Sequence, residues 1–172
     1  GLPGADVVAV RELAAKVAEL AALPVQQERI REWQALNGLR PERPMAMIDE
    51  IPWHELAAEG VPGADELAVT STHPFARELE TRLRRELYCW NHMRLDMVVR
   101  SHVDFERAVE HDGYGVGITE ATIDRGDGNT IVSHHYEDML AGEEDVARLR
   151  PPTIHLDPER TAEVEAMAHE CL

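Results

Sequence analysis

The chain has 172 residues, 44% of them hydrophobic and 29% charged, which is the balance of a globular protein rather than a disordered one. Its length predicts one domain. The 33 acidic and 17 basic residues give a formal charge of −16 at pH 7. An acidic surface repels phosphate backbones and anionic lipid headgroups, so we expect neither nucleic acid nor a membrane as a partner.

Two helices are predicted at the start of the chain. The first would be capped by Asp6 and ended by Pro24. Its apolar side chains recur at helical spacing on one face: Val10, Leu13, Ala14, Val17, Leu20 and Ala21. The second has apolar residues on one side and ends at Asn37-Gly38, where a left-handed C-cap is expected. We expect these helices to form an antiparallel hairpin.

Short apolar runs and one long amphipathic helix follow. Strands are predicted at residues 45–48, 66–70 and 95–99, with a short helix from Pro52 to about Ala58. The best-defined element is a helix over residues 74–93, with Thr72 or His73 near its cap. Its apolar face holds Phe75, Leu79, Leu83, Leu87 and Trp90. Its opposite face is expected in water and holds Arg77, Glu78, Arg84, Arg85 and Glu86.

The last third of the chain predicts a β-hairpin and two helices. Residues 114–122 alternate and contain glycine, which is typical of an edge or bulged strand. A turn at 124–129 and a partner strand at 130–136 complete the hairpin. A short acidic helix is expected at 143–149, and Asp157 should cap a final helix. The expected fold is therefore a single α+β domain over residues 1–172.

The two cysteines, Cys89 and Cys171, form no CxxC pair, and reduced thiols in the cytoplasm are the simplest interpretation. No apolar run approaches the ~18–20 residues that span a bilayer, and the N-terminus lacks a signal-peptide pattern. The sequence stops inside a helical pattern at Leu172, which predicts that it is the N-terminal part of a larger protein.

The densest polar cluster lies beside the predicted strand at 45–48. Glu50 and His54 are candidate catalytic residues, and Trp53 is a candidate substrate contact, because together they could form a pocket wall where a strand ends. The competing interpretation is structural: an acid caps the short helix and Trp53 packs in the core. Side-chain caps and core tryptophans are common, so that interpretation is favoured.

Asp96 is a third catalytic candidate, because an acid within a strand-like run needs partners or a shifted pKa. The alternative is that Asp96 lies at the strand entrance and accepts hydrogen bonds from backbone amides. His134 is a candidate substrate contact, although His134 and His135 on a strand would point to opposite faces.

The nine histidines show no metal-ligand spacing, so no metal site is predicted. The glycines at 113–117 precede no helix and predict no phosphate cradle.

A series of motifs covers nearly all of the chain: PVQQER at 24–29, WQALNGLRPERPM at 33–45, IDEIPW at 48–53, LRRELYCWNH at 83–92, DMVV at 96–99, VSHHY at 132–136 and EED at 143–145. Together they resemble the N-terminal region of uroporphyrinogen decarboxylase-like proteins. These proteins are roughly twice this length, and many are linked to corrinoid-dependent methyl transfer. The resemblance implies that a TIM-type barrel follows this region.

The resemblance implies a non-catalytic or rim-contributing region that packs on the barrel of the same or a companion chain, with a homodimer as a further expectation. The fragment alone would be inactive, and the whole enzyme would be a methyltransferase or decarboxylase-like. No cofactor is expected in this region; a corrinoid, or zinc held by His and Cys, would belong to the rest of the protein. The alternative is a stand-alone acidic binding or regulatory domain. Exposed apolar surface on the last helix and short strands would favour the fragment.

Overall fold

The computed structural model describes residues 1–93, 95–123 and 133–172, and the chain divides into two compact units. Unit 1 comprises Gly1–Phe105 and Val164–Leu172, and unit 2 comprises Glu106–Glu163. Unit 1 contains α1 (Gly4–Ala21), α2 (Pro24–Asn37), α3 (Trp53–Leu56), the 3-10 helix η1 (Ala64–Leu67) and α4 (Pro74–His92). Unit 2 contains β1 (Val109–His111), β2 (Glu120–Ile123), β3 (Ser133–Tyr136), α5 (Glu143–Val146) and β4 (Ile154–Leu156). α6 (Pro158–Cys171) begins in unit 2 and ends in unit 1, and the class is α+β, as predicted.

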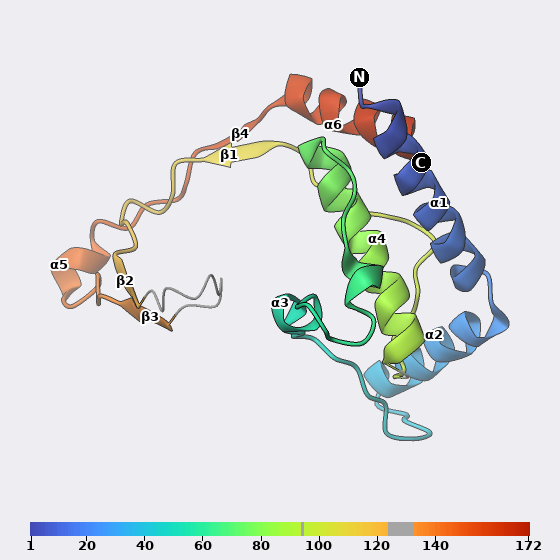
Figure 1. The fold of residues 1–172 in the computed structure, drawn as a ribbon. Coiled ribbons are helices and arrows are strands. Elements are labelled where there is room, and N and C mark those ends of the chain that lie inside the picture. The colour runs from blue at the N-terminus through green and yellow to red at the C-terminus, as the bar shows by residue number, and fades with distance from the viewer. Residues whose placement is uncertain (94, 124–132) are drawn as a thin grey trace. The chain divides into compact units, whose positions relative to one another are not determined.

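The core of unit 1 lies between α1 and α4, which pack against each other (Figure 1). The last turn of α6 joins this core through Cys171. The buried apolar side chains of the core are Leu2, Val10, Leu13, Val17, Ala76, Leu79, Leu83, Val99 and Cys171. The predicted hairpin of the first two helices is wrong, because α1 turns its apolar face to α4. α2 buries only Gln26 and has little apolar surface with which to pair.

Polar side chains tie distant segments of unit 1 together. α1 begins at Gly4 without the predicted Asp6 cap. Asp6 Oδ2 instead accepts hydrogen bonds from the Thr72 and His73 amides, at 3.0 and 2.8 Å, and holds the entry to α4. The predicted left-handed C-cap is also wrong, since Gly38 has φ −81° and the left-handed residue is Leu39 at φ 58°.

The strands predicted in unit 1 are absent from its described residues. Residues 45–48 and 95–99 have no regular structure, and η1 replaces the start of the strand expected at 66–70. Side chains supply several of the hydrogen bonds to the backbone of residues 95–99, and the Asp96 amide donates to the Ala46 carbonyl at 2.9 Å. The Val99 amide donates to Gln26 Oε1 at 3.0 Å, and the Asp96 carbonyl accepts from Trp33 Nε1 at 2.7 Å. These side chains occupy groups that a β-ladder would need.

The long amphipathic helix is confirmed as α4. His73 is its N-cap, and His73 Nδ1 accepts a hydrogen bond from the Phe75 amide at 3.3 Å. The predicted apolar face is buried or packs against the core. The prediction that Glu86 lies in water is wrong, because Glu86 is partly buried beneath residues 95–99. Glu80, which received no role from the sequence, is fully buried.

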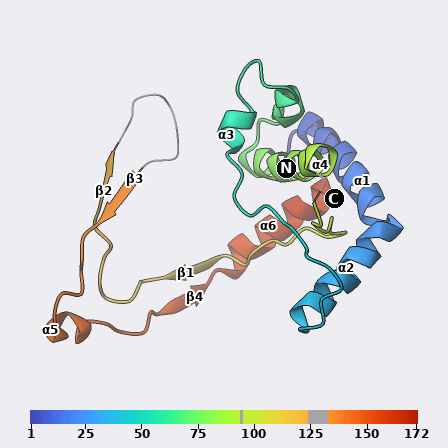
Figure 2. The ribbon, with the colours of Figure 1, turned by 90° about the horizontal axis from the view of Figure 1, so that it is seen from below.

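The described strands of unit 2 form two antiparallel ladders, β1 with β4 and β2 with β3 (Figure 2). In the first, Val109 pairs with Leu156 and His111 with Ile154; in the second, Glu120 pairs with Tyr136. The hairpin of β2 and β3 confirms the prediction, although its first strand begins at Glu120 rather than 114, and the predicted turn at 124–129 lies outside the described residues. The ladder of β1 with β4 was not predicted. None of residues 106–122 and 134–163 is buried.

Candidate functional site

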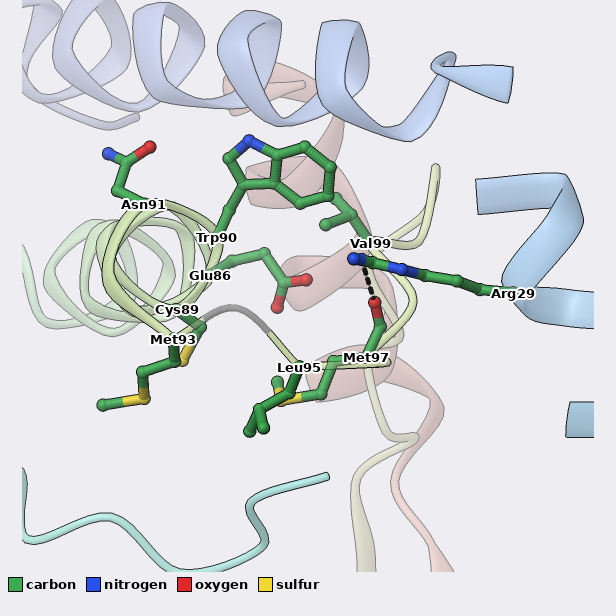
Figure 3. Close-up of a pocket in the computed structure, with 9 residues that line it drawn as sticks. All are labelled: Arg29, Glu86, Cys89, Trp90, Asn91, Met93, Leu95, Met97 and Val99. Atoms are coloured by element: carbon green, nitrogen blue, oxygen red, sulfur yellow. Dashed lines mark hydrogen bonds between the residues drawn. The ribbon is translucent and has the colours of Figure 1, made fainter. Parts of the chain in front are cut away.

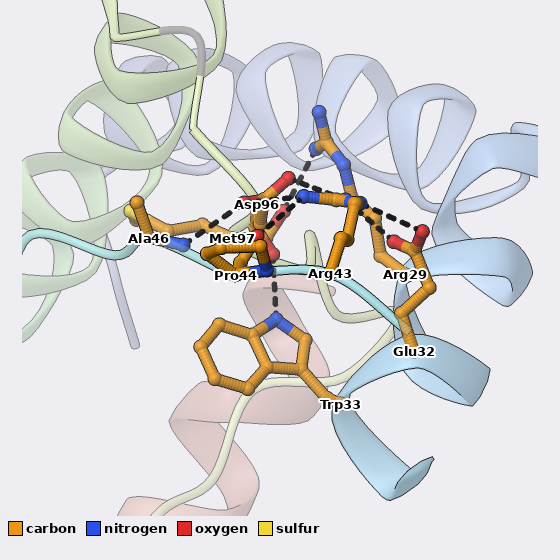
Figure 4. Close-up of polar contacts among 8 residues, drawn as sticks. All are labelled: Arg29, Glu32, Trp33, Arg43, Pro44, Ala46, Asp96 and Met97. Atoms are coloured by element: carbon orange, nitrogen blue, oxygen red, sulfur yellow. Dashed lines mark hydrogen bonds and ion pairs between the residues drawn. The ribbon is translucent and has the colours of Figure 1, made fainter. Parts of the chain in front are cut away.

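Asp96 lies at the centre of a charged network in unit 1 (Figure 4). The Arg43 guanidinium donates to both Asp96 oxygens, at 2.8 and 3.0 Å, and to both Glu32 oxygens, at 2.6 and 2.9 Å. Asp96 Oδ2 also accepts from the Ala46 amide at 2.9 Å. Arg29 Nη1 donates to the Met97 carbonyl at 2.8 Å. The network therefore fastens residues 43–46 and 96–97 to α2.

This environment fixes Asp96 in its ionised form. Hydrogen bonds from Arg43 and the Ala46 amide, together with the positive charge of Arg43, lower the pKa of Asp96 to about 2. A general base is most effective when its pKa lies near the working pH. Asp96 is thus equipped to anchor two chain segments. This is the structural interpretation that was weighed against a catalytic role.

Replacing Arg43 with alanine is expected to loosen residues 43–46 without unfolding unit 1, because Arg43 lies outside the buried core. Amide hydrogen exchange at Ala46 and Asp96 should accelerate by ~10-fold, because the Asp96 carboxylate, which accepts from the Ala46 amide, is no longer held by Arg43. Exchange measured by NMR checks this. Arg40→Ala is the matched control, because Arg40 is exposed and no described residue receives a hydrogen bond from its side chain. Equal acceleration in both variants would contradict a specific role for the network.

The Glu50, Trp53 and His54 candidates occupy one stretch of unit 1 but do not converge. Glu50 is exposed, and Trp53 packs edge-on against Tyr88 with ring centroids 6.0 Å apart. The Arg85 guanidinium lies 4.9 Å from the Trp53 ring centroid. Among the residues described, no hydrogen bond or ion pair joins Glu50, His54 and Asp96. Trp53 therefore fixes α3 against α4.

His134 lies on β3 in unit 2. Its Nδ1 is 3.0 Å from Glu120 Oε2 across the hairpin, and its ring stacks on Tyr136 with centroids 5.8 Å apart. The contact with Glu120 crosses from β3 to β2 and is of the kind that stabilises a small antiparallel pair, whereas the stacking on Tyr136 runs along β3 itself. Catalytic and substrate-binding roles for all five predicted residues stay predictions.

A cavity of about 350 Å³ lies between the C-terminal half of α4 and residues 95–99 (Figure 3). Six of its side chains are apolar or soft: Cys89, Trp90, Met93, Leu95, Met97 and Val99. Three are polar: Arg29, Glu86 and Asn91. A mostly apolar hollow with a few polar groups is the usual form of a small-molecule site. The cavity therefore has the form of a small-molecule site.

Glu86 is the unusual member of this lining. Burial raises the pKa of Glu86, and the positive charge of Arg100 opposes that shift only in part. Burial likewise raises the pKa of the Cys89 thiol, which disfavours a nucleophilic thiolate. A signal for Glu86 was present in the sequence. Glu86 lies seven residues after Leu79 and four before Trp90, a spacing that places it on the apolar face of α4.

The resemblance implies a metal site in the rest of the protein rather than in this region. Among the described residues, no group of three or more His, Cys, Asp or Glu side chains is arranged to hold a metal ion. Within the same residues, no helix is both long and apolar enough to cross a lipid bilayer. Comparison of the chain with protein-family models, curated proteins and solved structures finds no significant match.

Proposed function

We propose that this chain is the N-terminal, non-catalytic region of a uroporphyrinogen decarboxylase-like enzyme of the methyl-transfer type. In this proposal a TIM-type barrel, from the same chain or a companion chain, covers the apolar side chains of unit 2. The observation that carries it is that none of residues 106–122 and 134–163 is buried, although the strands of unit 2 carry large apolar side chains. The sequence motifs supply the identity of the covering domain.

Residues 106–122 and 134–163 of unit 2 form no buried core that would offset the cost of ordering the chain. The exposed fractions of three side chains on β1 and β4 are 50% for Val109, 66% for Ile154 and 51% for Leu156. Ordering backbone costs ~1–2 kcal/mol per residue, and a lone pair of strands is at best marginally stable in water. A covering domain would remove this apolar surface from water and stabilise the two ladders.

The chemistry in this proposal belongs to the remainder of the enzyme, where a corrinoid or zinc would be bound. This region alone is inactive and contributes at most to the rim of the site, through Glu50, Trp53, His54, Asp96 or His134. Reduced Cys89 and Cys171, both buried thiols, fit a cytoplasmic enzyme. The whole protein would act as a methyltransferase or a decarboxylase, and a homodimer is part of the proposal.

A stand-alone acidic binding or regulatory domain is the second candidate function. The specific observation in its favour is that unit 1 has its own buried core and a cavity lined mainly by apolar side chains. Binding without catalysis needs no more than this. The two candidates differ in what covers unit 2, and that difference can be measured.

The proposal is tested by comparing the 172-residue chain with the complete gene product. The intact mass comes first: a product of about twice 19.3 kDa is expected. Amides of β1 and β4 should then exchange with solvent ~100-fold or more slowly in the longer protein, because a covering domain restricts opening of the ladder.

Amides of α4 serve as the internal control, because its buried face packs in unit 1 and should be equally protected in both proteins. Equal exchange of β1 and β4 in both proteins would overturn the proposal. Protection that grows with concentration of the 172-residue chain would assign the cover to a second copy instead. A gene product of 19.3 kDa would favour the stand-alone domain.

A further inference from the structure

The cavity beside α4 contains a carboxylate without a described partner. Of its three polar side chains, Arg29 already donates to the Met97 carbonyl at 2.8 Å and lies 5.3 Å from the Trp90 ring centroid. Asn91 Nδ2 is within 3.4 Å of Glu66 Oε2. Glu86 accepts no hydrogen bond and makes no ion pair within the described part of the chain. The positive charge of Arg100 acts on Glu86, but Arg100 pairs with Asp104 at 2.9 Å.

The Glu86 side chain points into the cavity, where none of the described residues pairs with it. Figure 3 shows its carboxylate pointing from α4 into the space between Trp90 above and Leu95 and Met97 below. Glu86 is partly buried, and its carboxylate oxygens still reach water. A donor that enters the cavity would replace this water, and a positively charged donor would bind the carboxylate best.

The remaining lining restricts the chemistry of that donor. Trp90 and the two methionines present polarizable surfaces, which attract cations and adapt to irregular apolar shapes. An anionic ligand would face the Glu86 carboxylate in a chain of net charge −16. A volume of about 350 Å³ corresponds to the small end of ligand sites and admits a compact organic molecule rather than a large cofactor.

We propose that this cavity binds a small organic cation, in which an ammonium group on a compact apolar body donates hydrogen bonds to Glu86. The apolar body lies against Trp90, Met93 and Met97. The inference stands on unit 1 alone and does not rest on the function proposed for the whole enzyme. It assigns Glu86 a binding role and no catalytic role.

The test uses the intact protein and two probes of nearly equal size, 2-phenylethylamine, which is protonated at pH 7, and the neutral 2-phenylethanol. Binding is followed by calorimetry and by the NMR signal of the Trp90 indole N–H. The amine should bind, and Glu86→Gln should weaken its affinity by ~10- to 100-fold, the usual effect of losing a charge-assisted hydrogen bond. Affinity for the alcohol should stay within about twofold, because the apolar lining is unchanged.

Glu78→Gln is the matched control, since Glu78 is an exposed carboxylate on the same helix and should leave both affinities unchanged. An unchanged Trp90 signal in the free Glu86→Gln protein shows that the cavity is intact. Three results would overturn the proposal: no amine binding at ~10 mM, equal loss of amine affinity in both variants, or amine binding that Glu86→Gln leaves unaltered. Failure of this test leaves the exchange experiment on β1 and β4 untouched, so the two proposals can fail separately.

Discussion

Replacing Glu80 with alanine is expected to lower the free energy of unfolding of unit 1 by ~2–4 kcal/mol. Glu80 is 0% exposed. Its carboxylate accepts hydrogen bonds from the Thr70 and Ser71 amides at 3.1 and 2.7 Å and from Arg84 Nε at 2.7 Å. Alanine leaves these donors without an acceptor. Urea unfolding detected by tryptophan fluorescence measures the loss, because all three tryptophans lie in unit 1: Trp33, Trp53 and Trp90.

Glu78→Ala is the control for this experiment. Glu78 is exposed on the same helix, so its replacement removes the same charge from α4 without opening a buried network. The change in unfolding free energy should stay within ~0.5 kcal/mol. Comparable losses for Glu80→Ala and Glu78→Ala would mean that the buried network contributes little.

The same network predicts how the difference between wild type and Glu80→Ala varies with pH. Burial alone raises the pKa of Glu80, but hydrogen bonds from Ser71, Thr70 and Arg84 outweigh it and lower the pKa from 4.5 to about 2. A pKa that is lower in the folded chain than in the unfolded chain gives stability that is complete above the unfolded value. The difference should therefore be largest above pH ~5 and shrink as the pH falls toward ~2.

Glu80 and Glu86 show which features of α4 its helical spacing could predict and which it could not. Both lie at helical spacing from apolar residues of α4, so the sequence held a sign that they are not on the solvent face. Their different surroundings could not be predicted. Glu80 is met by the amides of residues 70–71, whereas Glu86 faces residues 95–99, and helical spacing says nothing of either approach.

Contacts between residues far apart in the sequence could not be predicted from local patterns either. The Arg43–Asp96 pair spans 53 residues, and the Asp6 hydrogen bond to the Thr72 amide spans 66. A local pattern identifies a polar residue that needs a partner but not the partner itself. The hairpin of β2 and β3 could be predicted because its strands are neighbours in sequence. The apolar runs at 45–48 and 95–99 were mistaken for strands because local spacing does not show which partner a backbone group finds. The Ala46 amide donates to the Asp96 carboxylate and the Val99 amide to the Gln26 side chain.

Leu79→Ala is expected to lower the free energy of unfolding of unit 1 by ~2–5 kcal/mol, through lost apolar burial and the cavity left behind. Leu79 is 1% exposed in the core between α1 and α4. The matched truncation in unit 2 is Ile154→Ala. Ile154 is 66% exposed, so in the 172-residue chain its loss should change stability by less than ~0.5 kcal/mol. Urea unfolding monitored by tryptophan fluorescence and by circular dichroism measures both.

The same two substitutions should also be measured in the complete gene product. If a barrel covers β4, as proposed, Ile154 becomes a buried side chain, and Ile154→Ala should then cost ~1–3 kcal/mol. Leu79→Ala should cost the same in both proteins, because the core around Leu79 lies within unit 1. A large cost of Ile154→Ala in the 172-residue chain alone would show that unit 2 has a core of its own. A negligible cost in both proteins would show that no domain packs on this face of β4.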